Sequence, residues 1–356
     1  MEGGSVLIAI WDKTSAIASR LHSAILRPLA MLAFALGYCL LLEIARFYWY
    51  VPAGWRFAAL ALLPWHYWPW ILGGELASRI WYEYVFDPPL ASQAPLPEFF
   101  LTLSGLVFLF AGPAGGALGS LLWRWRARNP RIALENLGGM GWFVIAALLG
   151  AVGETVGNLL SIHLNDDVLP IGLGRFVVGK LTGDYIGVIA LAPGLLALAK
   201  RHWAGERWMR DAIGVALVLA GYVALVRTDF DNTVYGYLRI LVLAPTFCCA
   251  IRHGWRGAAL ALTVSSFVVA LAPSLHPLDA YHDLFTQMLL AVFGTAALLL
   301  GSAVDAQRTV QADLALQNAA LESANAGLDH FGTELREAAQ RNLRMEEEQR
   351  RRIATE

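Results

Sequence analysis

An apolar stretch that carries charged residues constrains this sequence more than any other feature. Residues 171–200, IGLGRFVVGKLTGDYIGVIALAPGLLALAK, are long enough to cross a bilayer, because a membrane-spanning helix needs about 20 mainly apolar residues. Arg175, Lys180 and Asp184 lie inside this stretch. A charge at the centre of a membrane costs about 2.5–3.5 kcal/mol on insertion scales, so we expect such groups to be paired or used. Lys180 and Asp184 are four residues apart, share one helix face and can pair.

Composition extends this interpretation to most of the chain. Hydrophobic residues make up 57% of the sequence and charged residues 15%, which is outside the range typical of soluble globular domains. The sequence predicts an all-α, polytopic bundle of about ten transmembrane helices, at residues 27–50, 52–64, 66–86, 97–122, 134–162, 171–199, 210–228, 235–251, 255–273 and 280–304. The second segment covers only about 21 Å at 1.5 Å per residue, so we expect a short or tilted span buried against its neighbours.

The loops between these segments alternate in charge. Basic residues follow the fourth and sixth segments and flank the turn between the eighth and ninth: Arg124, Arg126, Arg128, Arg131, Lys200, Arg201, Arg207, Arg210, Arg252 and Arg256. The alternate loops, 87–98, 163–170 and 273–283, contain no Lys or Arg. The positive-inside rule then predicts a multi-pass protein of the inner (plasma) membrane with both termini in the cytoplasm. Because the arginine clusters lie in short loops between spans, nucleic-acid binding has no support.

Both ends of the chain have the periodicity of amphipathic helices. We expect residues 1–26 to lie on the membrane surface rather than to form a cleaved signal peptide. From Ala303 to Met345, apolar residues recur at spacings of three and four, which predicts a coiled-coil seam continuing from the last span. Gln317 and Asn342 at core positions are typical of residues that fix the register. We expect a parallel homodimer through residues 303–345; the alternative is a solvated single helix.

Three patches stand in order along the second to sixth segments: Val51-Pro52-Ala53-Gly54 followed by Pro69, Leu72-Gly73-Gly74 and Ala77; Gly153-Glu154-Thr155-Val156-Gly157-Asn158; and Gly183-Asp184-Tyr185-Ile186-Gly187 followed by Ala192-Pro193. In order and position they resemble the first-type membrane-associated sensor (MASE) family of bacterial integral membrane input domains. The resemblance covers roughly residues 30–305. It implies a sensory input domain in the membrane.

The last residues carry a second resemblance. The run EQRRRIATE at 348–356 is similar to the approach to the phosphoacceptor motif in one histidine kinase subclass, to which hexose-phosphate sensor kinases with this input domain belong. This implies that a Leu-His-Asp motif and an ATP-binding domain would follow Glu356. The chain itself is then expected to be no enzyme and to need no cofactor. A response regulator would engage only the missing kinase part.

The domain organisation follows from these segments. We predict an amphipathic N-terminal segment at 1–26, an integral membrane sensor domain at 27–305, a coiled-coil signalling stalk at 306–345 and the start of a kinase dimerisation region at 346–356.

Ionisable residues on several predicted spans fall at similar depth towards the outer side. We expect a polar pocket for a small anionic ligand, because arginine and lysine hold anionic groups through charge-assisted hydrogen bonds. The alternative is a set of structural salt bridges that bind nothing. Arg46 and Arg56 are weaker members, since they could extend to the lipid headgroups, as could Arg239. The candidate ligand-binding residues are Glu75, Arg79, Glu154, Asn158, Arg175, Lys180, Asp184 and Arg239.

Metal and disulfide chemistry have little support. The loop 276–283 and the residues His163, Asp166 and Asp167 include metal-ligand types, but their spacing matches no strong metal motif. Ordinary solvated loops are the favoured interpretation, and no metal site is predicted. The three cysteines lie in apolar segments and imply no disulfide framework.

These observations favour the membrane input module of a bacterial two-component signalling protein. It would detect a small ligand or a membrane partner protein and act through the coiled coil on a histidine kinase. One alternative is a secondary transporter whose buried charges couple to its substrate. Another is the same sensor domain attached to an enzyme of cyclic-dinucleotide metabolism.

Overall fold

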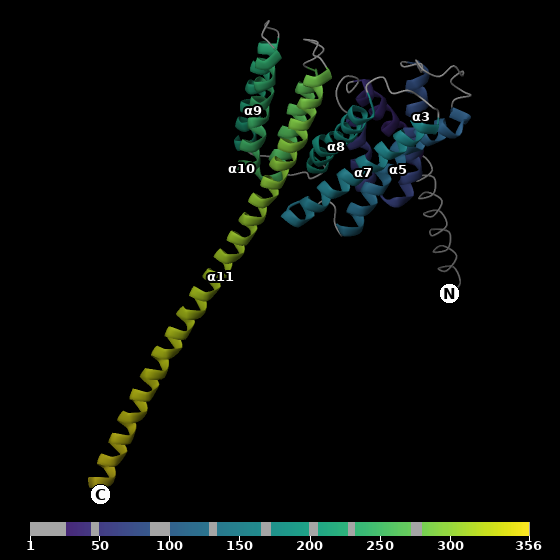
Figure 1. Ribbon diagram of the computed structural model, residues 1–356. Coiled ribbons are helices and arrows are strands. Elements are labelled where there is room, and N and C mark those ends of the chain that lie inside the picture. Colours follow the sequence, from purple (N-terminus) through teal and green to yellow (C-terminus); the bar gives the residue numbers. More distant parts are fainter. Residues whose placement is uncertain are drawn as a thin grey trace, which may run out of the picture. The chain divides into compact units, whose positions relative to one another are not determined.

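The computed structural model describes residues 26–43, 50–85, 100–127, 134–164, 172–198, 206–226, 232–271 and 280–355. Within these ranges the regular secondary structure is entirely helical (Figure 1). The predicted all-α membrane helix bundle is therefore confirmed. The chain divides into two compact units, Met1–Asp305 and Ala306–Glu356. The predicted N-terminal amphipathic segment lies outside the described residues, apart from its last position.

The elements follow one another with short connections. After a first helix at Leu26–Glu43, they are α2 (Val51–Leu62), the 3-10 turn η1 (Trp65–Tyr67), α3 (Trp68–Val85), α5 (Leu103–Arg126), α7 (Leu137–Leu164), α8 (Leu173–Leu198), α9 (Glu206–Val226), α10 (Asn232–Leu271) and α11 (Ala280–Thr355). Six helices in the described part are long and apolar enough to cross a membrane. The predicted count of about ten spans stays a prediction.

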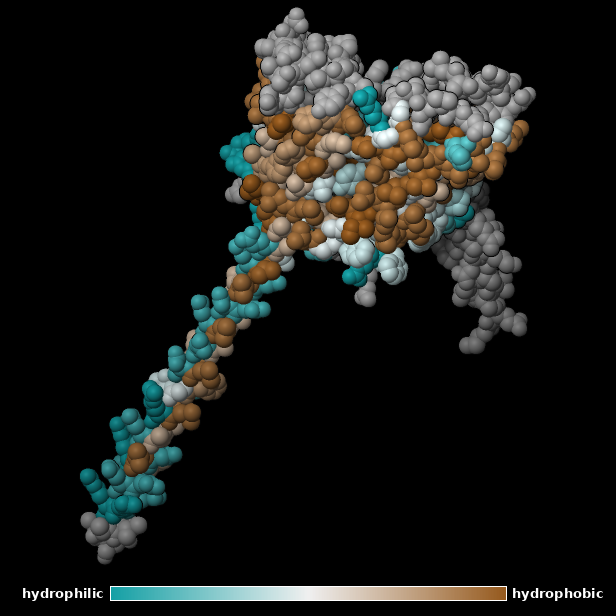
Figure 2. All heavy atoms as spheres, in the orientation of Figure 1, coloured by the Kyte–Doolittle hydropathy of each residue, from teal (hydrophilic) through white to brown (hydrophobic). Residues whose placement is uncertain are grey.

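The surface of the bundle is apolar where lipid would contact it. Figure 2 shows brown, hydrophobic side chains over most of the described bundle surface in this view. Large apolar residues such as Leu36, Leu101 and Leu217 are exposed. In water this exposure would be unfavourable, whereas lipid chains are as apolar as these side chains. With the run of apolar helices, it identifies a multi-pass membrane protein.

Helix α2 is short because it lies inside the bundle. It has only 12 residues, and nine of them are buried. Gly54 of α2 contacts the backbone carbonyl of Gly187 in α8, and Gly187 in turn contacts the carbonyl of Tyr50. A Cβ atom at either glycine would collide with backbone. Gly187 therefore makes a close approach to α2, whereas a Cβ at Gly179 of the same helix would meet nothing within 4 Å.

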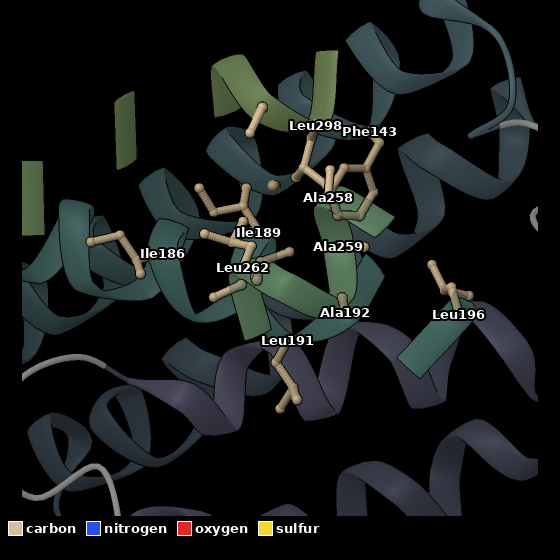
Figure 3. Close-up of a cluster of buried hydrophobic side chains, with 14 of the residues drawn as sticks. Phe143, Ile186, Ile189, Leu191, Ala192, Leu196, Ala258, Ala259, Leu262 and Leu298 are labelled. Atoms are coloured by element: carbon tan, nitrogen blue, oxygen red, sulfur yellow. The ribbon is translucent and has the colours of Figure 1, made fainter. Parts of the chain in front are cut away.

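Helix α8 is the central element of the apolar core. It contacts α2, α7 and α10. Figure 3 shows its Ile186, Ile189, Leu191, Ala192 and Leu196 among residues from three other helices: Phe143 of α7, Ala258, Ala259 and Leu262 of α10, and Leu298 of α11. Close packing on several sides fixes the rotation of α8 about its axis, because a rotated helix would leave cavities. This rotation also determines where its charged residues point.

Helix α10 contains a break at Gly254, where the backbone has φ 67° and ψ −154°. The eighth and ninth predicted segments, 235–251 and 255–273, thus lie in one element on either side of this break. The N–H of Trp255 begins the second half and donates to Oδ2 of Asp305 in α11, at 2.9 Å. This carboxylate satisfies a backbone donor that a helix start leaves without a partner. Gly301 of α11 packs against the backbone of Trp255 at the same place.

The second unit is a single helix, the part of α11 from Ala306 onward. Its predicted seam residues Val310, Leu314, Leu321 and Leu328 are all exposed. An apolar row along an otherwise polar helix is favourable only when another surface covers it. The coiled coil and the homodimer stay predictions.

Candidate functional site

Six charged side chains from four helices meet inside the bundle, and we call them the charge cluster. Its cations are Arg56 of α2, Arg79 of α3 and Lys180 of α8; its carboxylates are Glu75 of α3, Glu154 of α7 and Asp184 of α8. The formal charges of this cluster cancel, three positive against three negative. Balanced pairing is what makes such a group tolerable in a low-dielectric environment.

Glu154 is the residue that connects the cluster. Its Oε2 accepts from Nη2 of Arg56 at 2.6 Å. Its Oε1 accepts from Nη2 of Arg79 at 2.9 Å and from Nζ of Lys180 at 3.3 Å. One carboxylate therefore holds three cations that come from three different helices. A shift of α7 relative to any of these helices would change at least one of these ion pairs.

Arg56 and Arg79 are fixed from several sides. The Arg56 side chain is only 2% exposed and also donates to Oε1 of Glu75. Arg79 donates to the hydroxyl groups of Tyr50 at 2.9 Å and Tyr38 at 3.2 Å, and these two hydroxyls are hydrogen-bonded to each other. Arginine suits this position because its guanidinium group offers five N–H donors in a rigid plane.

Lys180 is the most accessible cation of the cluster. Its side chain is 21% exposed, and its Nζ donates to Oδ1 of Asp184 at 2.7 Å. The pairing of these two residues expected from their spacing is therefore present. Nζ also lies 4.5 Å from the centre of the Tyr50 ring, a cation–π distance. The other carboxylate oxygen of Asp184 is buried without a hydrogen-bond partner in the described structure.

A small cavity adjoins the cluster. Its volume is about 160 Å³, and Arg79, Lys180 and Glu154 of the cluster are part of its lining: Leu42, Tyr50, Arg79, Tyr82, Phe108, Glu154, Asn158 and Lys180. Water occupies about 30 Å³ per molecule in the liquid, so this space suits a few waters or one small polar group. Asn158 donates from Nδ2 to the backbone carbonyl of Glu154 at 2.8 Å, and its side chain forms part of the wall.

The structure brings together most, not all, of the candidate residues. Glu75, Arg79, Glu154, Lys180 and Asp184 are in the cluster, and Asn158 lines the cavity. Arg175 is exposed near the start of α8, about one turn before Lys180, and takes no part in the network of ion pairs that links the described charged residues. Arg239 lies in α10, but its side chain is outside the described part.

Three residues of the site were underestimated or missed. The expectation that Arg56 could extend to the headgroups is wrong, because its side chain is almost completely buried. A signal for this was present: a 12-residue segment that must be surrounded by protein offers an arginine no route to the membrane surface. Sequence patterns do not indicate a role for Tyr50, since a tyrosine at the end of a span is usually an interface residue, or for Tyr38, which is a single hydroxyl group within an apolar segment.

Glycines on α5 make the space that the two guanidinium groups occupy. A Cβ at Gly112 would collide with Arg79, and one at Gly116 would collide with Arg56. The spacing of four residues places both glycines on one face of α5. A pair of small residues facing buried arginines is a pattern that only the helix arrangement reveals.

The described part of the chain contains no candidate metal site. No group of three or more His, Cys, Asp or Glu residues there could hold a metal ion. The loop 276–279, Asp166 and Asp167 lie outside the described residues. The cysteines at 39, 248 and 249 are free thiols.

A hydrogen bond links the helix of the cluster to the helix that leaves the bundle. Tyr185, the neighbour of Asp184 in α8, forms a hydrogen bond of 2.6 Å with the Thr295 hydroxyl in α11. Gly294, next to Thr295, packs against Leu262 of α10 and Ile189 of α8. Helices α8 and α11 are therefore in direct contact beside the charge cluster.

Comparison with known proteins agrees with this architecture. The family model MASE1 matches residues 13–308, which is most of the chain and contains the charge cluster and its cavity. No curated protein matches the sequence, and no solved structure matches it. MASE1 domains are membrane-associated sensory input domains of signalling proteins and are not catalytic. This chain, a multi-pass helix bundle with a buried polar centre, therefore belongs to the MASE1 family of membrane sensory domains.

Proposed function

We propose that this chain is the membrane input module of a two-component signalling protein and that the charge cluster is its sensory site. The observation that carries the proposal is the cluster itself: six charges from four helices, neutral in sum, beside a cavity. A purely structural set of ion pairs needs no adjoining space. A sensory site needs both a cavity and groups whose pairing a ligand can change.

The ligand class follows from the lining of the cavity. Arg79 and Lys180 present N–H donors there, and both are also bound by Glu154. A small anionic group, such as a carboxylate or a phosphate, would compete with Glu154 for these donors. Because the charges of the cluster cancel, an anion that pairs with Arg79 or Lys180 leaves Glu154 with weaker partners. Binding thus favours a different arrangement of α7.

Transmission would follow the contacts of α8. Asp184 is the neighbour of Tyr185, and Lys180 lies about one turn before it. The Tyr185 hydroxyl is hydrogen-bonded to Thr295 of α11. A ligand that biases the position of α8 would also bias that of α11. The stalk at 303–345 would pass the change to a partner copy and to a histidine kinase beyond residue 356. Such transmission requires an element with two discrete arrangements, and the ligand must bind one of them more tightly than the other.

The output rests on the run EQRRRIATE at 348–356, which resembles the segment before a kinase phosphoacceptor. An enzyme of cyclic-dinucleotide metabolism is the competing output. Solute uptake by the purified chain in proteoliposomes would instead identify a transporter.

A thermal-shift measurement on the purified full chain in detergent tests the sensory site. Small carboxylates and sugar phosphates are screened for stabilisation, since a ligand at 100 times its dissociation constant adds about 2.7 kcal/mol. Lys180→Gln should abolish the shift, because it removes the most accessible donor of the cavity. Arg175→Gln is the matched control: it removes one positive charge from the same helix, outside the cluster.

The outcomes separate the two interpretations of the cluster. Stabilisation by an anion that survives in Arg175→Gln and disappears in Lys180→Gln supports the proposal. Equal shifts in both variants would place the anion elsewhere. No shift with any anion, in a chain whose Lys180→Gln variant is folded, would favour structural ion pairs and a protein partner as the signal.

A further inference from the structure

A second cavity lies between α9 and α10, away from the charge cluster. Its volume is about 420 Å³, within the range of about 300–1,000 Å³ typical of ligand pockets. We call it the α9–α10 groove. Its lining is Arg210, Asp211, Gly214, Val215, Val218, Leu241, Ala244, Pro245, Cys248, Cys249 and Arg252.

The groove is polar at one end and apolar over the rest of its length. The two helices run antiparallel, so Arg210 and Asp211 at the start of α9 lie at the same end as Arg252 of α10. Away from this end, the wall is made only of small and apolar side chains from Gly214 to Val218 and from Leu241 to Cys249. Such a division matches a ligand with one charged end and a long apolar part.

The length of the groove matches one leaflet of a bilayer. From residue 210 to residue 218, α9 rises about 12 Å, and from 241 to 252, α10 rises about 16 Å, at 1.5 Å per residue. Half of a hydrocarbon core of about 30 Å is about 15 Å. The arginine end coincides with the loops that the positive-inside rule assigns to the cytoplasm. The groove would therefore extend from the inner headgroup region to about the middle of the membrane.

The rim can hold an anionic headgroup. The Arg252 side chain is 66% exposed, and its Nη1 donates to Asp211 at 2.5 Å. Asp211 is also bonded to Nε2 of His253 at 2.6 Å, so it holds both side chains in place. The side chains of Arg210 and Arg252 are both exposed, and a guanidinium group carries N–H donors that match phosphate oxygens. Two arginines against one aspartate leave the rim positive.

We propose that the α9–α10 groove binds an anionic phospholipid of the inner leaflet, with one acyl chain in the groove and its phosphate at Arg210 and Arg252. A second copy of the chain is the competing occupant. A symmetric contact through this groove, about an axis perpendicular to the membrane, would bring the arginine rims of the two copies together. Repulsion between the arginines of the two copies disfavours this dimer contact, whereas the phosphate of a lipid would neutralise the arginines.

The main test is native mass spectrometry of the full chain in detergent, with phosphatidylglycerol or phosphatidylcholine of the same acyl chains added. The wild-type chain should retain one phosphatidylglycerol with an affinity about tenfold higher than for phosphatidylcholine, because each arginine near a headgroup favours the anionic lipid. Arg210→Gln/Arg252→Gln should remove this preference. Arg126→Gln/Arg256→Gln removes the same charge from α5 and from the second half of α10, outside the lining of the groove, and should keep the preference.

A second variant tests the apolar part of the groove. A Cβ at Gly214 would meet no atom within 4 Å, so Gly214→Phe fills the groove without a backbone collision. It should weaken retention of both lipids, in contrast to the arginine variant. The single exposed change Arg210→Gln serves if the double variant does not fold. Equal affinity for the two lipids, or a preference unchanged in Arg210→Gln/Arg252→Gln, would overturn the proposal.

Labelling of Cys248 gives an independent measurement. Cys248 is exposed in the groove, whereas Cys249 is buried. In a Cys39→Ala/Cys249→Ala chain, phosphatidylglycerol should slow the reaction of Cys248 with a maleimide several-fold more than phosphatidylcholine does. If slowing depends on protein concentration and not on lipid, a second copy occupies the groove and the proposal fails.

Discussion

Burial determines the importance of each charged residue in this bundle, and Glu154 is the clearest case. Its carboxylate holds Arg56, Arg79 and Lys180 together, and the Glu154 side chain itself is only 1% exposed. The Glu135–Arg256 pair has a similar bond length, 2.8 Å, but both side chains are about one-third exposed. Equal geometry thus has unequal consequences, because water replaces a lost partner only at the second site.

At the residue scale we predict that Glu154→Gln lowers the free energy of unfolding by about 3–5 kcal/mol, since it leaves three buried cations against two carboxylates. Glu135→Gln should change it by about 1 kcal/mol or less. Unfolding in detergent, followed by tryptophan fluorescence, gives both values. A similar effect of the two substitutions would mean that water reaches the charge cluster.

Glycine contacts determine how closely the helices approach. At the element scale, α2 and α8 meet with their backbones nearly touching, at Gly54 and Gly187. In α10, Asp305 of α11 stabilises the break at Gly254. Its carboxylate accepts a hydrogen bond from the first residue of the second half of α10. The close approach and the break each depend on single residues, so one substitution can test each of them.

The two glycines of α8 offer a matched comparison. Gly187→Ala should destabilise the bundle, because its Cβ would collide with the Tyr50 carbonyl and overpacking costs about 1–3 kcal/mol. Gly179→Ala has open space and should be neutral or stabilising by about 0.5–1 kcal/mol, the usual gain of Ala over Gly in a helix. Thermal unfolding of both variants decides. A destabilising Gly179→Ala would contradict the arrangement of α8.

Asp305 acts as a cap for the second half of α10. Asp305→Ala should lower the free energy of unfolding by about 0.5–2 kcal/mol, as the loss of an N-cap does. Asp313→Ala, which removes the same group from the exposed part of α11, is the control and should have little effect. Hydrogen exchange of the Trp255 amide measures the local consequence and should become faster only in Asp305→Ala.

For the whole molecule, sequence patterns predicted the helices well and their mutual placement poorly. Apolar blocks and charged loops located the segments, because a helix in a membrane must satisfy its own backbone. The i,i+4 spacing predicted the Lys180–Asp184 pair, since that contact is local. The pairs of Arg56 with Glu75 and Glu154 join residues 19 and 98 positions apart, and no local periodicity reports such contacts.

The exposed row on the second unit leads to a prediction about assembly. Leu321 belongs to the predicted seam, whereas Leu316 is equally apolar and exposed but lies outside it. Leu321→Asp should raise the dissociation constant of a dimer at least about tenfold, because it places a charge in a desolvated core. Leu316→Asp should leave it unchanged. Sedimentation of the full chain in detergent measures both, and a monomeric wild-type chain would contradict the coiled coil.

The burial of Arg56 also sets an order of events during synthesis. Helix α2 is too short to remain in a membrane alone, and although Glu75 follows its arginine after 19 residues, the second partner, Glu154, follows only after 98. When α2 leaves the ribosome, neither α7 nor α8 exists to neutralise or surround it. Its final position must therefore be reached after the later helices have entered the membrane. A nascent chain halted before residue 154 should keep α2 accessible to water-soluble reagents, and the same segment should become protected once α8 is complete.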